Sequence, residues 1–139
     1  MEKQNILISN DKSKLDLKVI YQFLSQSYWA NNRTLEQIEE SIRHSICFGV
    51  YANDQQIGFA RVITDRATFA YVADVFILPA YRGLGYSKQL MTAILSDTSL
   101  SEVNSWFLIT KDAQGLYEKF GFSAFHDKDP DKTVMKMNK

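Results

Sequence analysis

Residues 75–91 read VFILPAYRGLGYSKQLM, and this stretch decides the fold. Its first part is an apolar run typical of a buried strand, and Pro79, which has no backbone N–H, ends that strand. The loop AYRGLGY follows, and a helix is predicted from about Gly85 to Leu95 because apolar residues then recur at helical spacing. A strand, a glycine loop and a helix therefore follow one another directly.

The glycine loop has the composition of an anion-binding turn. Gly83 and Gly85 can adopt positive φ, and the N-terminus of the following helix offers backbone N–H groups with a partial positive charge. Arg82 adds a full charge beside them. A dinucleotide-binding fingerprint needs glycine where Lys88 stands, so the loop does not match that motif. An NTPase phosphate loop needs lysine directly after its second glycine, where this chain has Tyr86, so the loop does not match that motif either. A tight turn that binds nothing is the alternative.

Other segments supply strands and helices on both sides of this stretch. Before it, the periodicity predicts a strand over 5–9, a helix over about 13–28, a helix from a capping box at Thr34 to about His44, and an antiparallel meander over 47–52, 56–65 and 68–79. After it, a strand is predicted over 105–110, a helix over 113–120 between a cap at Asp112 and Gly121, and an antiparallel pair over 121–126 and 133–138.

Composition and charge exclude several classes of protein. The 139 residues suit one domain over 1–139, and 45% hydrophobic content supports a packed core. Sixteen Lys and Arg balance sixteen Asp and Glu, so no nucleic-acid partner is expected. Cys47 is the only cysteine, and no His and Cys cluster has metal spacing, so no metal is expected. Without a signal peptide or an apolar run of membrane length, we expect a cytoplasmic protein with no membrane partner.

Two motifs resemble those of the GNAT superfamily of N-acetyltransferases. The family's acetyl-CoA signature matches Arg82, Gly85 and Ser87, with serine at the last position. A second family segment matches Thr110, Ala113, Leu116, Tyr117, Gly121 and Phe122, with threonine at the first position. The resemblance implies an α+β single domain in the order β-α-α-β-β-β-α-β-α-β-β. Its mostly antiparallel mixed sheet would have six to seven strands, flanked by about four helices.

The resemblance also implies acetyl-CoA as co-substrate. Its pantetheine arm would add to the splayed strand around Phe76, whose side chain has core packing as the alternative. The backbone N–H of Ile77 would stabilise the oxyanion, and Tyr117 would protonate the leaving thiolate, with packing in its helix as the alternative. The residues expected to bind acetyl-CoA are Phe76, Ile77, Leu78, Arg82, Gly83, Leu84, Gly85, Tyr86, Ser87 and Thr110.

Residue chemistry suggests a general base, and the resemblance implies where the acceptor would bind. Asp74 lies in an apolar strand, where burial would raise its pKa toward that of a useful base; an ion pair with Arg61 or a place at the rim of the sheet is the alternative. In similar folds the connection between the first two helices covers the acceptor, and here it holds Tyr28, Trp29 and Arg33. We hypothesise that Arg33 contacts an acceptor carboxylate; a core tryptophan beside a solvated arginine is the alternative.

Together these features predict transfer of acetyl from acetyl-CoA to a primary amine of a small molecule, amino acid or peptide by direct attack in a ternary complex. The alternative is a non-catalytic acyl-CoA binding or regulatory module with the same fold. A bare interaction domain would require both motifs to arise for structural reasons only. A homodimer could form if the apolar segment 133–138 pairs across a two-fold axis.

Overall fold

The structure is a computed structural model that describes residues 5–139. It divides into two compact units, one ending at Ile109 and the other comprising Thr110–Lys139. The first unit holds all five strands and the longer helices, and the second holds two short helices. Nothing in this division tests the prediction of one domain over 1–139, which stays a prediction.

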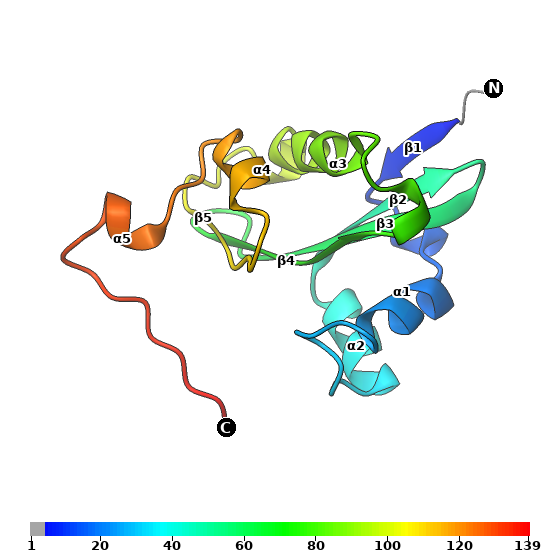
Figure 1. The fold of residues 1–139 in the computed structure, drawn as a ribbon, viewed down its shortest axis with the longest axis horizontal. Helices are drawn as coiled ribbons and strands as arrows, with labels where there is room; N and C mark the ends of the chain where they lie inside the picture. Colours follow the sequence, from blue (N-terminus) through cyan, green and yellow to red (C-terminus); the bar gives the residue numbers. More distant parts are fainter. Residues whose placement is uncertain (1–4) are drawn as a thin grey trace. The chain divides into compact units, whose positions relative to one another are not determined.

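A five-stranded mixed sheet forms the centre of the first unit (Figure 1). The strands lie in sequence order, and the first four are antiparallel neighbours, as the meander predicted. The fifth is parallel to the fourth. Their bounds are β1 Ile6–Ser9, β2 Ile46–Ala52, β3 Gln55–Thr64, β4 Ala70–Ile77 and β5 Trp106–Leu108.

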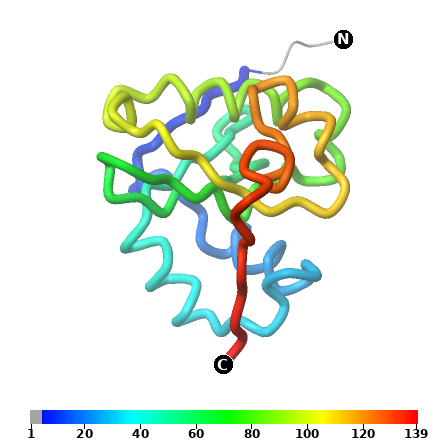
Figure 2. The backbone as a smooth tube through the Cα atoms, turned by 90° about the vertical axis from the view of Figure 1, so that its left-hand side faces the viewer, coloured from blue at the N-terminus to red at the C-terminus, as the bar shows by residue number. Residues whose placement is uncertain are grey.

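Helices α1 (Leu17–Leu24) and α2 (Leu35–Arg43) cover one face of this sheet, and α3 (Tyr86–Leu95) covers the other (Figures 1 and 2). The predicted capping box is present: Thr34 accepts from the N–H of Gln37, and the Gln37 side chain accepts in return from the N–H of Thr34. Short 3-10 turns lie at Lys12–Lys14, Pro79–Tyr81 and Thr98–Leu100.

One hydrophobic core lies between α1, α2 and the sheet. It is built from buried side chains of every one of these elements, namely Ile20, Leu24, Ala30, Ile38, Cys47, Phe59 and Phe76. Burial raises the pKa of the Cys47 thiol to about 11, so this cysteine is a packing residue rather than a reactive thiolate. No helix of the described chain is both long and apolar enough to cross a membrane.

The predicted helix over 13–28 is shorter in the structure. Asp16 begins α1 by accepting from the N–H groups of Lys18 and Val19, and the helix already ends at Leu24. The chain from Ser25 to Thr34 is a connection of turns. It is stabilised by the hydrogen bond that Ser27 Oγ accepts from the N–H of Ala30. This irregular connection carries all three predicted acceptor residues.

The second unit corrects the predicted end of the fold. It contains α4 (Gln114–Glu118) and α5 (Phe125–Lys128), so residues 5–139 hold five strands and five α-helices rather than six to seven and about four. The antiparallel pair over 121–126 and 133–138 is wrong. A two-stranded hairpin without a packed face is marginal in water, and the methionines at 135 and 137 are exposed. Pairing of 133–138 in a homodimer stays a prediction.

A buried phenol gives a stability prediction. The Tyr51 hydroxyl is buried, it has no hydrogen-bond partner among the described residues, and it lies where a side chain at Gly49 would clash. Burial raises the pKa of Tyr51 to about 12. We expect Tyr51→Phe to raise the free energy of unfolding by about 1 kcal/mol, because the unpaired polar atom disappears, whereas Gly49→Ala should lower it by about 1–3 kcal/mol. Urea unfolding measures both changes. A clear loss of stability in Tyr51→Phe would contradict the description of the Tyr51 hydroxyl as buried and unpaired.

Candidate active site

The glycine loop after β4 is open, as the sequence predicts. Gly83 and Gly85 have φ values of 79° and 85°, and a Cβ added at either position would meet no heavy atom within 4 Å. Leu84 between them is 58% exposed. Both glycines therefore adopt a conformation that disfavours other residues, around a space that is free to receive a ligand.

The first turn of α3 faces this space with unused donors. Gly85 is the N-cap residue and offers no side chain, and the first intrahelical bond runs from the N–H of Gln89 to the carbonyl of Gly85. The N–H groups of Tyr86, Ser87 and Lys88 thus have no acceptor within the helix. A helix N-terminus behind two open glycines suits a phosphate or pyrophosphate group.

Arg82 connects the loop to the preceding strand. Its Nε donates to the carbonyl oxygen of Ile77 at 2.9 Å, which holds the guanidinium beside the loop. The terminal nitrogens of the same group are further donors, in a fork that matches phosphate oxygens. Arg82 therefore both fixes the course of the loop and brings a positive charge to it.

Strand β4 has an open edge that leads into the loop. It pairs with β5 only from Ala70 to Val72, yet it continues to Ile77, so no strand of the described chain pairs with residues 73–77 on that side. On the other side Leu78 donates its N–H to the carbonyl of Ile57 at 2.7 Å. Because alternate N–H groups of a strand point to opposite edges, the N–H of Ile77 points to the open edge. An extended ligand with amide groups can pair there.

The side chains of this edge belong to the core. Phe76 is buried and stacks on Phe23, with ring centroids 4.0 Å apart and planes 13° from parallel. Leu78 packs against the same core. The alternative of core packing is therefore right for the Phe76 side chain, while the backbone of the strand still carries the open edge.

A β-bulge in β4 was not predicted. Two residues of β4, Asp74 and Val75, lie opposite one residue of β3, Ala60. Asp74 takes φ 55°, in the left-handed region that aspartate tolerates better than most residues. A bulge re-aims the side chain that it carries. The only signal in the sequence was an aspartate inside an apolar run.

The bulge directs Asp74 into a buried cluster of donors. Its Oδ2 accepts from Arg61 Nε at 2.9 Å and from Arg33 Nη1 at 2.8 Å, and its Oδ1 accepts from Trp29 Nε1 at 3.0 Å. Only 1% of the Asp74 side chain is exposed. Arg61 also donates from Nη1 to Ser45 Oγ at 3.1 Å, a partner that the sequence did not indicate. The structure thus brings together Trp29, Arg33 and Asp74, three of the predicted site residues.

The expected rise in the pKa of Asp74 is wrong. Burial alone would raise this pKa, but the hydrogen bonds and charges of Arg33 and Arg61 together outweigh burial and hold it below its usual value. The ion pair with Arg61, the alternative reading, is present. A carboxylate of low pKa is a weak base, so the predicted role of Asp74 as general base, which no observation tests directly, is disfavoured.

The connection between α1 and α2 places aromatic side chains beside this cluster. Trp29 is 37% exposed and packs on Phe23, with ring centroids 6.2 Å apart. Tyr28 meets Trp29 edge-on at 5.1 Å and is largely exposed. Trp29 is therefore neither a fully buried plug nor a free surface residue, because one part packs on the core and another part faces solvent.

The second unit carries the remaining predicted residues. Tyr117 lies in α4, is buried, and meets Phe122 edge-on with ring centroids 6.0 Å apart. Burial raises the pKa of its phenol. Thr110 Oγ1 accepts from the N–H of Ala113 at 3.0 Å, so Thr110 rather than the predicted Asp112 holds the start of this helix. Gly121, with φ 95°, ends the turn as predicted.

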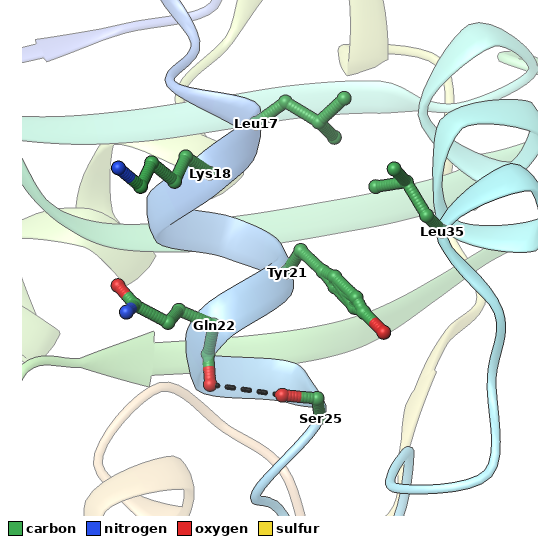
Figure 3. A pocket seen from close by; sticks show the side chains of 6 residues that line it. All are labelled: Leu17, Lys18, Tyr21, Gln22, Ser25 and Leu35. Atoms are coloured by element: carbon green, nitrogen blue, oxygen red, sulfur yellow. Dashed lines mark hydrogen bonds between the residues drawn. The ribbon is translucent and has the colours of Figure 1, made fainter.

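A groove of about 500 Å³ lies in the first unit and is lined from α1 and the start of α2. Figure 3 shows Leu17 and Tyr21 on the side of α1 that is turned toward Leu35, at the start of α2. Lys18, Gln22 and Ser25 complete its lining, so none of the predicted site residues contributes. Within residues 5–139, no three His, Cys, Asp or Glu side chains form a metal-binding group.

An open strand edge that runs into a glycine loop and a helix N-terminus is suited to an extended ligand that ends in phosphates. Comparison with known families identifies the class of protein: the model of the acetyltransferase (GNAT) domain matches residues 43–124, which include β2, β3, β4, the glycine loop and α4. The chain belongs to the GNAT acetyltransferase family, whose members use acetyl-CoA.

Individual relatives agree with this assignment. A solved structure from Xanthomonas campestris, described as belonging to the GNAT family, is 40% identical, covers 96% of this chain and 93% of its own, and has a TM-score of 0.87. The uncharacterized N-acetyltransferase ycf52 of Porphyra purpurea is 29% identical over 137 residues, which are 94% of this chain and 75% of the relative. N-acetylglutamate synthase from Neisseria gonorrhoeae, solved with coenzyme A and N-acetyl-glutamate, shares the fold at 18% identity and a TM-score of 0.72, over 93% of this chain and 31% of that one.

Proposed function

We propose that this protein is an acetyl-CoA-dependent N-acetyltransferase that moves an acetyl group to a primary amine of a small molecule, amino acid or peptide. The observation that carries the proposal is the continuity of three features: the open edge of β4 over residues 73–77, the glycine loop, and the N-terminus of α3. The amides of a pantetheine arm can pair with the open edge of β4, and a pyrophosphate suits the glycine loop and the N-terminus of α3.

Binding of acetyl-CoA involves the backbone more than side chains. The arm pairs along the open edge around Ile77, whose N–H faces it, and the side chains of the neighbouring Phe76 and Leu78 remain in or against the core. Its phosphates meet the N–H groups and the guanidinium of the loop. The proposed binding residues are Phe76, Ile77, Leu78, Arg82, Gly83, Leu84, Gly85, Tyr86, Ser87 and Thr110.

The reaction is a direct attack in a ternary complex. The neutral amine forms a bond to the thioester carbonyl carbon, the C–S bond breaks, and CoA leaves as thiol. The N–H of Ile77 donates to the oxyanion that forms between these steps. Tyr117 gives its proton to the leaving sulfur. The amine loses its proton to solvent, and Tyr117 regains one from solvent after CoA leaves. Asp74 is not assigned as the acceptor, because its two oxygens already accept hydrogen bonds from Trp29, Arg33 and Arg61.

The acceptor side of the site is assigned to the connection between α1 and α2, with Tyr28, Trp29 and Arg33. A [ribosomal protein bS18]-alanine N-acetyltransferase of Haemophilus influenzae is 36% identical over 76 residues, which are 51% of this chain and 50% of that protein. Its name describes acetylation of an alanine. That relative supports an amine acceptor of amino-acid or peptide type for this chain.

Glycine substitution in the loop tests the binding site. We expect Gly85→Ala to weaken acetyl-CoA binding about tenfold, because alanine disfavours the left-handed conformation by about 1–2 kcal/mol and its Cβ would project into the open space. Calorimetric titration with acetyl-CoA measures this change. Gly121→Ala is the matched control, because it has φ 95° and equally open surroundings. Equal affinity of the wild type and Gly85→Ala would contradict the proposed site.

A further inference from the structure

We propose that Arg33 binds a carboxylate of the acceptor, so that the substrates of this enzyme are amines that carry a carboxylate group. This inference rests on the proposed function and names its substrate class. It starts from the charges around the bulge of β4, where Asp74 accepts from both Arg33 and Arg61.

The cluster has one positive charge too many. Two guanidinium groups share one carboxylate, and within the described chain both arginines have an ion pair with Asp74 only. A buried or half-buried charge without a partner is costly, so a site of this kind favours an incoming anion. The surplus is one unit, which matches a carboxylate; a phosphate dianion would leave a negative charge in its place.

The surplus charge is accessible at Arg33. Arg61 is enclosed, with 10% of its side chain exposed and its donors directed to Asp74 and Ser45. Arg33 exposes 28% of its side chain and uses Nη1 for Asp74. The rest of its planar fork is available for a second carboxylate, in the paired geometry that arginine favours. Asp74 therefore acts as a positioning residue, which fixes the direction in which Arg33 points.

Neighbouring groups complete a subsite for a small amino acid. Trp29 donates to the other oxygen of the same carboxylate, so its half-exposed ring lies next to the guanidinium, with Tyr28 at its edge. These rings offer an apolar wall for the carbon chain of the acceptor. Asp74 lies three residues before Ile77, roughly 10 Å along the strand, so a guanidinium near Asp74 and a thioester at Ile77 can be spanned by a small amino acid.

The test compares matched amines as acceptors, with thiol release from acetyl-CoA as the readout. Glycine is paired with glycinamide, β-alanine with propylamine, and aminomethylphosphonate gives the phosphate-like arm, within a wider panel of amino acids. We expect kcat/KM to be about tenfold or more higher for the carboxylate member of a pair. Arg33→Gln should remove that preference through an increase in KM of about 10–100-fold, with neutral amines unaffected. Arg33→Lys should restore it in part.

Arg43→Gln is the control, because it removes the same charge from an exposed ion pair with Glu40 on α2. Thermal unfolding shows whether Arg33→Gln is folded, and its affinity for acetyl-CoA shows whether it still binds the co-substrate. Thiol release that is equal within each pair and insensitive to Arg33→Gln would overturn this inference and leave the proposed function standing. Preference for the phosphonate would also overturn it. If no amine of the panel leads to thiol release, both this inference and the proposed function are overturned.

Discussion

Replacement of Tyr117 by phenylalanine is expected to lower kcat for acetyl transfer by about 10²–10⁴-fold. The phenol is the group assigned to protonate the leaving thiolate, and phenylalanine keeps the ring that packs edge-on against Phe122. The loss should therefore appear in kcat, with little change in acetyl-CoA affinity or in the free energy of unfolding. Steady-state thiol release, with calorimetry on the same samples, separates these quantities.

The pH dependence gives a second view of the same residue. Because burial raises the pKa of Tyr117 above its ordinary value of about 10, the phenol stays protonated throughout the range from about pH 6 to 9. Its titration should not lower kcat in that range. Tyr51→Phe is a suitable control, since it removes another buried phenol hydroxyl. Unchanged kcat in Tyr117→Phe would contradict the assigned role and leave Tyr117 as a packing residue.

Removal of the Asp74 carboxylate has the largest expected effect on stability. We expect Asp74→Ala to lower the free energy of unfolding by about 3–5 kcal/mol, because it leaves the enclosed Arg61 without its counter-charge. Alanine also disfavours the left-handed conformation at this position, at a further cost of about 1–2 kcal/mol. Urea unfolding measures the total.

Asp74→Asn separates the two contributions. Asparagine tolerates φ 55° and can still accept from Trp29, but it carries no charge for the two arginines. It should therefore recover the backbone part of the loss and keep the electrostatic part. A loss below about 1 kcal/mol for both variants would contradict the buried ion-pair cluster, since exposed pairs contribute only that much.

The sign of the pH effect follows from the pKa of Asp74. Because this pKa is held below its usual value in the folded chain, the carboxylate stabilises the fold at every pH above its unfolded pKa of about 3.9. That stabilisation is lost only as the pH falls through the folded pKa. The difference between the wild type and Asp74→Asn should thus be constant from about pH 5 to 8 and shrink below about pH 4.

Much of the first unit could be predicted from local sequence patterns. The capping box at Thr34 and the meander were predicted because helix caps and period-two alternation are local signals. The open loop at Gly83 and Gly85 was predicted because only a few residue types adopt positive φ readily. The glycine loop that is proposed to bind acetyl-CoA is therefore among the parts that the sequence predicts.

Two parts could not be predicted in this way. The bulge at Asp74 depends on the pairing of β4 with β3, and the shift in its pKa depends on Arg33, which lies 41 residues earlier in the chain. The last strand pair failed for a different reason: alternation over 133–138 satisfies a strand pattern, but a pattern alone supplies no packed surface against which to bury Met135 and Met137.

The most direct test of the central claim is release of CoA from acetyl-CoA by the wild-type protein in the presence of the amine panel, with the acetylated product identified by mass spectrometry. We predict thiol release that needs both the protein and an amine, saturates in each substrate, and yields an amine bearing one acetyl group. Tight binding of acetyl-CoA without release for any amine would contradict the transferase assignment and leave an acyl-CoA binding module in its place.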